Sequence, residues 1–312
     1  MASKMDDRLT SSILWPRKTR EMHNHHMDST IWNDFEFRND DIIIATYGKS
    51  GTTWTQQIVA QLVTGGDENL IVGDESPWLD LRVQPKAEKL AAIEAQTHRR
   101  FIKTHLPVDA LVFSPRAKYL YIGRDGRDVA WSLYNHLFYG TDTYYNMINE
   151  TPGRVGPPMQ RPPASVHQYF IDWFEKDGYP IWPFWENVRS WWEIRSLPNV
   201  LLLHFADLKA NLEHEVRRIA AFLDIAVEES RWPDILDHCK FDYMKANASK
   251  YITAGDELWE GGPKTFINKG TNGRWRDVLT EAESRRYEER AVRELGTACA
   301  RWLARGSAPT GS

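Results

Sequence analysis

One segment of the sequence combines a lysine, glycines and hydroxyl side chains where a buried strand should give way to a helix. Lys49 stands between Gly48 and Gly51, shortly after the apolar run 42–45. Glycine lets the backbone approach a ligand closely, and the first N–H groups of a helix attract an anion. The segment therefore predicts a phosphate-binding loop, with further donors on Ser50, Thr52 and Thr53.

Two other interpretations of this segment are weaker. The Gly-Lys-Ser triplet at 48–50 is also found in the Walker loop of nucleotide triphosphatases, but that pattern needs a glycine five positions earlier, and Ile43 stands there. A turn with capping hydroxyls explains the serine and the threonines. It does not explain a lysine between two glycines.

Two further strand ends carry residues suited to acid–base and phosphate chemistry. His105 follows the short apolar stretch 101–102, and an imidazole is an effective general base near neutral pH. A lone histidine is more often a structural hydrogen bonder, so its position alone leaves both roles open. Arg124 follows the apolar run 119–122, and its guanidinium suits phosphate oxygens. The adjacent charges are expected to be helix-start charges and surface pairs; they are Asp125, Arg127 and Asp128.

The first two motifs resemble those of the cytosolic sulfotransferases, whose sulfuryl donor is 3′-phosphoadenosine 5′-phosphosulfate. Residues 46–54 are similar to that family's 5′-phosphosulfate loop, with Gly48 where the family usually has proline. The Lys-Thr-His-Leu-Pro segment at 103–107 is similar to the family's base segment. The resemblance implies that His105 is the general base. It also implies that charge developing during transfer is stabilised by Lys49 and Lys103.

The resemblance extends to a 3′-phosphate site. Arg124 and Ser132 have the spacing of the family's arginine and serine for that phosphate. Residues 266–275 are similar to the family's Arg-Lys-Gly-x-x-Gly-x-Trp loop, with Asn268 in place of the arginine. One charged contact to the donor is therefore lost or supplied elsewhere. The matching positions of this loop include Lys269 and Gly270.

An adenine site is implied in the same way. Trp54 and Phe241 are expected to lie against the base, since residues 238–241 resemble the family's adenine-contacting segment. Phe205 stands where the family commonly has tyrosine, so a hydroxyl contact is missing there. The resemblance covers roughly residues 41–280, with four separated motifs in the family's order.

The acceptor is less strongly encoded. Trp78 lies in a segment that resembles one placing an aromatic side chain over the acceptor, with ordinary packing as the alternative. An apolar pocket wall is expected from Phe138, Tyr139, Tyr144 and Tyr145. The tryptophans of 182–192 are expected on one helix and in core or partner packing. The aromatic content favours a phenol or another flat, apolar alcohol as the acceptor.

Alternating strand and helix patterns predict one α/β domain, a central parallel sheet flanked by helices. Strands are expected at 42–45, 101–102, 119–122 and 200–203, and helices from about 54 to 64, at 85–98, 128–138 and 212–223. The resemblance implies the P-loop-like sulfotransferase fold over 41–305. We expect a solvated, partly irregular segment at 1–40, binding loops at 140–165 and 254–274, and a disordered tail at 306–312.

Composition narrows the function further. A net charge of −4 over 312 residues disfavours a general nucleic-acid binder. The sequence has no membrane-span pattern and no signal-peptide pattern at its start, so a cytoplasmic protein is expected. Cys239 and Cys299 make no disulfide framework. No metal is expected, and the neighbouring His23, His25 and His26 are expected to be solvated.

Three functions are weighed. The first is sulfuryl transfer to a small-molecule hydroxyl, without nucleic-acid or membrane partners. The second is a kinase or triphosphatase, which the missing Walker glycine disfavours, and the third is a non-catalytic nucleotide-binding protein. The oligomeric state stays open, because the family's dimer signature would fall near 276–285, where Glu281 follows Thr280 and Arg285 occupies the acidic position.

Overall fold

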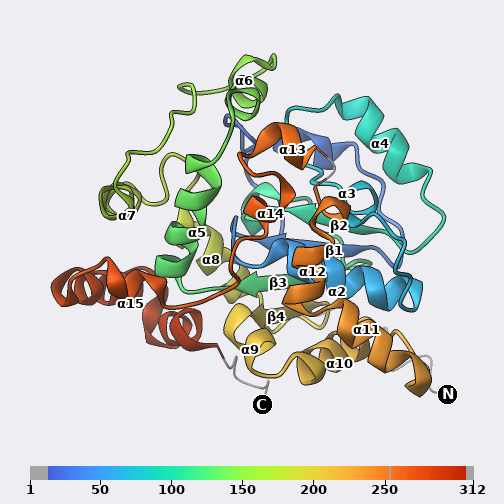
Figure 1. The fold of residues 1–312 in the computed structure, drawn as a ribbon. Helices are drawn as coiled ribbons and strands as arrows, with labels where there is room; N and C mark the ends of the chain where they lie inside the picture. The colour runs from blue at the N-terminus through green and yellow to red at the C-terminus, as the bar shows by residue number, and fades with distance from the viewer. Residues whose placement is uncertain (1–12, 253, 307–312) are drawn as a thin grey trace.

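The centre of the fold is a parallel sheet of four strands in the order β2-β1-β3-β4 (Figure 1). The structure, a computed structural model, describes residues 13–252 and 254–306. All four predicted strands are confirmed: β1 (Ile42–Thr46), β2 (Phe101–Thr104), β3 (Lys118–Gly123) and β4 (Val200–His204). Their continuous apolar runs are explained by the helices that cover both faces of the sheet.

Alternate residues of β1 enter two separate cores. Ile42 and Ile44 pack on one face against α2 (Thr52–Thr64), α9 (Phe205–Ala210), α10 (Leu212–Phe222), α11 (Trp232–His238) and α12 (Phe241–Ala246). Ile43 and Ala45 pack on the other face against α5 (Gly126–Phe138), α7 (Val166–Glu175), α8 (Phe184–Glu193) and α15 (Glu281–Arg305). The predicted single α/β domain is confirmed.

The strand register brings several chain segments to one edge of the sheet. Ala45 pairs with Thr104 of β2 and with Tyr121 of β3, and Gly123 pairs with His204 of β4. The carboxyl ends of all four strands therefore meet, which is where open α/β sheets bind ligands.

The N-terminal segment departs from its prediction. The side chains of Met22, Met27 and Trp32 are buried in the core, and a short 3-10 helix, η1 (Ser29–Asn33), follows. His25 and His26 are only 6% and 5% exposed, so the expectation that they are solvated is wrong. Apolar residues spaced along an otherwise polar segment anchor it to the domain.

The two segments expected to be irregular contain short helices. α6 (Asp142–Glu150) lies within 140–165, and α13 (Gly255–Leu258) and α14 (Pro263–Phe266) lie within 254–274. Thr141 starts α6, since its hydroxyl accepts a hydrogen bond from the Tyr144 N–H. The remaining helices are α3 (Val72–Glu75) and α4 (Lys86–Glu94), the latter shorter than predicted. α8 begins after Trp182, which therefore lies outside the expected helix.

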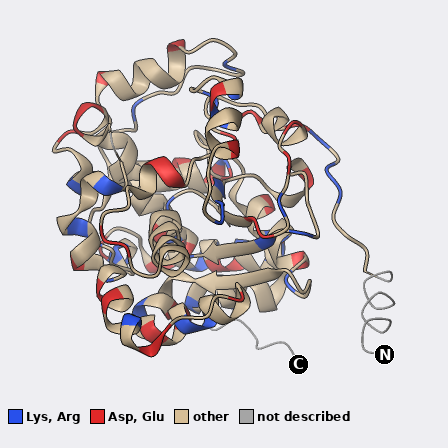
Figure 2. Ribbon diagram, turned by 90° about the vertical axis from the view of Figure 1, so that its right-hand side faces the viewer, with Lys and Arg blue, Asp and Glu red and all other residues tan. Residues whose placement is uncertain are grey.

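Several global features bear on the function classes. Basic and acidic residues are interspersed over the helices in Figure 2. Among residues 13–252 and 254–306, no helix has the length and apolarity needed to cross a membrane, and no cluster of three or more potential metal ligands occurs. Both cysteines are free and buried. The predicted disordered tail, 306–312, lies outside the described residues apart from Gly306.

Candidate active site

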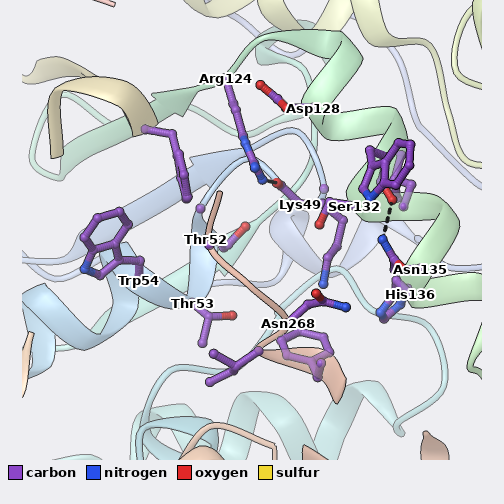
Figure 3. A pocket seen from close by; sticks show the side chains of 18 of the residues that line it. Lys49, Thr52, Thr53, Trp54, Arg124, Asp128, Ser132, Asn135, His136 and Asn268 are labelled. Atoms are coloured by element: carbon purple, nitrogen blue, oxygen red, sulfur yellow. Dashed lines mark hydrogen bonds between the residues drawn. The ribbon is translucent and has the colours of Figure 1, made fainter. Parts of the chain in front are cut away.

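The carboxyl edge of the sheet opens into a large cavity. It contains about 1260 Å³ of empty space, including the part open to solvent. Lys49 and Arg124 point toward its middle, while Trp54 and His136 lie on opposite sides (Figure 3). The cavity therefore lies between residues of α2 and residues of α5.

The predicted phosphate loop forms one wall of this cavity. Gly51 starts α2 at a φ of 121° and no side chain caps the helix, so the first N–H groups of α2 are available to a ligand. A Cβ at Gly51 would lie 2.9 Å from Ile122 and 3.0 Å from Phe205, which only glycine avoids. Lys49 also has a positive φ, 67°, and such backbone strain is concentrated at functional sites.

The cavity holds an excess of positive charge. Burial, together with the neighbouring Lys103 and Arg124, lowers the pKa of Lys49 to about 7. Burial also lowers the pKa of Lys103 to about 8 and that of Arg124 to about 10. Asp128, the acid beside Arg124, has its pKa raised by burial to about 6. None of these three cations forms an ion pair with a described residue, and cations held close together in this way indicate a site that an anionic ligand completes.

Arg124 joins the separate walls of this site. Its guanidinium donates to the carbonyls of Lys49 and Thr271, at 3.1 and 2.9 Å, and to the Asn272 side-chain oxygen at 3.1 Å. The guanidinium carbon lies 4.1 Å from the centre of the Phe205 ring. Arg124 therefore connects the phosphate loop, residues 46–54, to the C-terminal loop, residues 266–275. Its charge remains available to the cavity.

His105 is held in one tautomer by its neighbours. Its Nδ1 lies 2.7 Å from the Thr46 carbonyl, which can only accept, so Nδ1 carries the proton. Burial and the nearby lysines hold the pKa of His105 well below its usual value, so the ring is neutral. Nε2 is therefore the unprotonated nitrogen. Since His105 lines the cavity, this nitrogen is suited to accept a proton there.

Helix α8 holds the backbone behind His105. The Asn187 amide donates to the His105 carbonyl at 2.9 Å, and the Trp191 indole donates to the Leu106 carbonyl at 3.1 Å. Trp191 is fully buried. The core-packing interpretation of the tryptophan-rich helix is confirmed for Trp185, Trp191 and Trp192, and this packing also positions His105.

Aromatic rings surround the cavity end next to His105. The Trp78 ring meets the His105 ring edge to face, with centroids 4.6 Å apart, and Trp182 lies 5.5 Å from His105. The Trp78 indole donates to the Asp80 carboxylate at 2.7 Å, which fixes the ring. The Lys103 ammonium lies 4.9 Å from the Trp78 ring centre. This end of the cavity is suited to an apolar or flat ligand.

The C-terminal loop closes the opposite end. Asn268, Lys269 and Gly270 line the cavity, and Gly270 is so close to Phe241 that an added Cβ would lie 2.5 Å from its ring. Arg274 also lines the cavity, with its guanidinium 4.6 Å above the Trp131 ring. Within the part of the chain that the structure describes, Arg274 forms no ion pair.

Comparison with known proteins decides the family. Residues 39–297 match the family model described as a sulfotransferase domain. The chain belongs to the sulfotransferase family. This sulfotransferase is 34% identical to a glycolipid sulfotransferase of Mycobacterium tuberculosis, over 84% of this chain and 87% of that relative. It is 29% identical to human sulfotransferase 1E1, over 92% and 96% of the two chains.

Solved structures agree with the fold. A retinol dehydratase complex with androsterone and inactive cofactor PAP matches with a TM-score of 0.64 and 25% identity, over 85% of this chain and 83% of that one. Mouse sulfotransferase SULT7A1 complexed with PAP matches with a TM-score of 0.66 and 23% identity, over 88% and 91%. The predicted fold of this sulfotransferase is confirmed, and sulfuryl transfer is the activity of its family.

Most predicted site residues of this sulfotransferase line one cavity. They are Lys49, Gly51, Thr52, Thr53, Trp54, Trp78, Lys103, His105, Arg124, Ser132, Phe205, Phe241, Asn268, Lys269 and Gly270. Ser50 instead lies beneath the loop, where its side chain is buried and its N–H donates to the Tyr47 carbonyl at 3.2 Å. Of the four residues expected to form the acceptor wall, only Tyr144 lines the cavity. Phe138 and Tyr139 are instead 39% and 36% exposed, and Tyr145 is buried away from the cavity.

The charges after Arg124 are not surface pairs. Asp125 and Arg127 form a buried ion pair with an oxygen–nitrogen distance of 2.6 Å. Asp128 lines the cavity, and its carboxylate accepts a hydrogen bond from the Gly273 N–H at 2.7 Å. Surface exposure is lost because α15 and the C-terminal loop fold over the start of α5.

Several residues that line the cavity were not predicted from the sequence. They are His26, Trp131, His136, Trp182 and Arg274. His136 carries a signal, since it lies four positions after Ser132 and so on the same face of α5. His26 carries none, because its place depends on how the N-terminal segment packs.

Proposed function

We propose that this protein transfers a sulfuryl group from 3′-phosphoadenosine 5′-phosphosulfate to a hydroxyl of a small aromatic or alicyclic acceptor. One observation carries the proposal: a single cavity contains both a cluster of cations at a helix start, free of ion pairs with described residues, and a histidine whose Nε2 is unprotonated. The first suits the anionic groups of the donor. The second suits the proton of an attacking hydroxyl.

The donor fits the residues present. The N-terminus of α2 and Lys49 would hold the 5′-phosphosulfate, and Arg124 and Ser132 the 3′-phosphate. Trp54 and Phe241 flank the same side of the cavity and would hold the adenine. PAP is the ligand in the retinol dehydratase and SULT7A1 complexes, which supports this choice.

Arg274 would supply the cation that Asn268 does not. Both residues line the cavity on the same loop, and the Arg274 guanidinium is free of ion pairs with described residues. A guanidinium can approach a phosphate from another position on the loop, because its side chain is long and its donors are spread in a fork. The substitution at 268 would then weaken donor binding less than its loss of charge suggests.

The chain's own residues would act on the acceptor as follows. The bound donor supplies the sulfuryl group, and the acceptor oxygen loses a proton as it gains its bond to sulfur. Nε2 of His105 accepts that proton while the Nδ1–H remains bonded to the Thr46 carbonyl. Lys49 and Lys103 stabilise negative charge on the transferring group and on the departing phosphate.

The rings next to His105 support a cyclic acceptor. Trp78 and Trp182 provide flat apolar surfaces within 5.5 Å, centroid to centroid, of the His105 ring. Androsterone and retinol are the ligands in the retinol dehydratase complexes, and both are apolar alcohols that contain a ring. The glycolipid sulfotransferase of Mycobacterium tuberculosis gives larger lipid alcohols a place in any acceptor panel.

A transfer assay tests the proposal. Donor labelled in its sulfuryl group is incubated with the protein and a panel of phenols, cyclic alcohols, amines and glycolipids. The proposal predicts label in products of cyclic hydroxyl compounds, without added metal. Magnesium-dependent consumption of ATP would indicate a kinase or triphosphatase instead. Donor binding without any product would indicate a non-catalytic nucleotide-binding protein.

A further inference from the structure

The cavity wall beyond Trp78 is polar, although it is made of rings. His26, Tyr144 and His136 all line it, and none of the three forms an ion pair with a described residue. The His26 ring stacks 6.0 Å from Trp78, and the His136 ring meets the Tyr144 ring at 5.5 Å. A purely hydrocarbon acceptor would make no hydrogen bond to this wall.

A chain of hydrogen bonds fixes what Tyr144 can offer. The Pro180 carbonyl accepts from His25 Nε2 at 2.5 Å, so the proton of this neutral ring is on Nε2 and its Nδ1 is an acceptor. His26 Nδ1 contacts His25 Nδ1 and must therefore donate to it. His26 Nε2 is then unprotonated, and the Tyr144 hydroxyl, 3.1 Å away, donates to it. With its proton used, the Tyr144 oxygen can only accept from a ligand.

His136 presents a second unused polar group. Its Nδ1 is sealed from solvent and has no hydrogen-bond partner among the described residues, so only Nε2 is left to meet a ligand in the cavity. Burial holds the pKa of His136 well below its usual value, and the ring is neutral. Orphaned buried N–H groups are rarer than orphaned acceptors, which favours the proton on Nε2.

This wall is held rigidly. Arg82 donates to the His25 carbonyl at 3.0 Å and to the Ile148 carbonyl at 2.6 Å, which joins the N-terminal segment to the end of α6. The same side chain also binds the carbonyl of Thr151 at 2.6 Å. His26 and Tyr144 are therefore preorganised, and rigid polar groups discriminate between ligands.

We propose that the acceptor is a diol: one hydroxyl reaches His105, and a second donates to the Tyr144 oxygen and accepts from His136 Nε2. This inference rests on the proposed sulfuryl transfer and specifies its substrate class. A hydroxyl matches the wall because it donates and accepts at one atom, whereas a ketone or an ether can only accept. A ring bearing a single hydroxyl would give the Tyr144 oxygen no donor and His136 Nε2 no acceptor. Sites built to hydrogen-bond a substrate hydroxyl reject analogues that lack it.

The test compares matched acceptors in matched variants. Resorcinol, hydroquinone and 2,7-dihydroxynaphthalene cover different oxygen–oxygen separations, and each is paired with its mono-hydroxyl parent and its monomethyl ether. The variants are His136→Phe and Tyr144→Phe, which keep an aromatic side chain and remove its polar atoms. Tyr139→Phe is the control, because it removes a tyrosine hydroxyl outside the cavity. kcat/KM is measured for transfer, and calorimetry measures binding with and without 3′-phosphoadenosine 5′-phosphate.

For at least one oxygen–oxygen separation, we expect kcat/KM for the diol to exceed that for its mono-hydroxyl parent and its monomethyl ether by about tenfold or more. This ratio should fall toward one in His136→Phe and Tyr144→Phe and persist in Tyr139→Phe. Equal kcat/KM for all three compounds of every set would overturn the diol inference while leaving sulfuryl transfer intact. If no compound is a substrate, the proposed sulfuryl transfer fails. Tighter binding of the diols, abolished in both His136→Phe and Tyr144→Phe, would still support recognition of a second hydroxyl by this wall. Equal binding of the diols, their mono-hydroxyl parents and their monomethyl ethers would reject recognition of a second hydroxyl.

Discussion

The two ends of the cavity are built in different ways. The donor end depends on backbone N–H groups at the start of α2 and on cations that follow strand ends, such as Lys49 and Arg124. The acceptor end depends on rings from unconnected segments, such as His26, Trp78 and Tyr144. The donor end thus recognises charge through local geometry, and the acceptor end recognises shape and hydrogen bonding through tertiary packing. Substitutions at the donor end should therefore change nucleotide affinity, and substitutions at the acceptor end should change the acceptor KM.

The largest effect should come from His105, which lies where the two ends meet. His105→Ala removes the nitrogen that accepts the proton, and loss of a general base typically lowers kcat by about 10²- to 10⁴-fold. Nucleotide affinity should be unchanged. Steady-state kinetics and calorimetry measure the two quantities, and His214→Ala, on an exposed side chain of α10, is the control. A kcat close to that of the unchanged protein would remove His105 from the mechanism.

Lys49→Met should separate donor binding from stability. Loss of a charge-assisted contact worth about 1.5–3 kcal/mol would weaken nucleotide binding by about 10- to 100-fold. The same change should stabilise the ligand-free protein, because Lys49 is buried beside other cations. Thermal unfolding with and without nucleotide reports both effects, with Lys264→Met on the exposed side of α14 as the control. Lower stability without nucleotide would contradict the charge argument.

The lysine also predicts a pH dependence. Its pKa is about 7 in the folded, ligand-free protein, against 10.5 for an unperturbed lysine. The unfolded chain therefore binds more protons between these values, and the Lys49 contribution to the free energy of unfolding rises with pH across that range. An anion raises the folded pKa again, so nucleotide binding at pH 8 should take up a proton and weaken as pH increases. Calorimetry in buffers of different ionisation enthalpy measures this uptake. Its absence would show that Lys49 is already charged.

At the acceptor end, Trp78→Ala should act on the other substrate. Removal of the ring beside His105 should raise the acceptor KM by about tenfold, the scale of a lost aromatic contact and its buried area. The nucleotide dissociation constant should stay the same, because Trp78 lies at the opposite end from Trp54 and Phe241. A parallel loss of nucleotide affinity would show that the two ends are not independent.

The smallest effect concerns Arg274 and Asn268. Arg274→Gln should weaken binding of 3′-phosphoadenosine 5′-phosphate several-fold while leaving AMP unaffected, as expected for one partly exposed contact. Asn268→Arg should restore the loss. Arg276→Gln, on the same loop but exposed, provides the control. An equal loss for AMP would place Arg274 away from the 3′-phosphate.

The difference between the ends also explains what could be predicted from the sequence. The β1–α2 loop and the strand ends before His105 and Arg124 are local patterns, and parallel strands bring such ends together by topology alone. The position of His26 depends on tertiary packing of buried residues spread over the N-terminal segment. Phe138 and Tyr139 were misplaced for a related reason: the sequence predicts α5, but not the residue at which it turns away from the cavity.

The central claim is that one cavity binds a nucleotide by phosphates at both ends of its ribose. Calorimetric titration with 3′-phosphoadenosine 5′-phosphate and with AMP tests it most directly, since the two ligands differ only in the 3′-phosphate. Charge-assisted contacts from Arg124 and the C-terminal loop predict a preference of about 100-fold for the bisphosphate. Equal affinity for the two nucleotides would contradict the account.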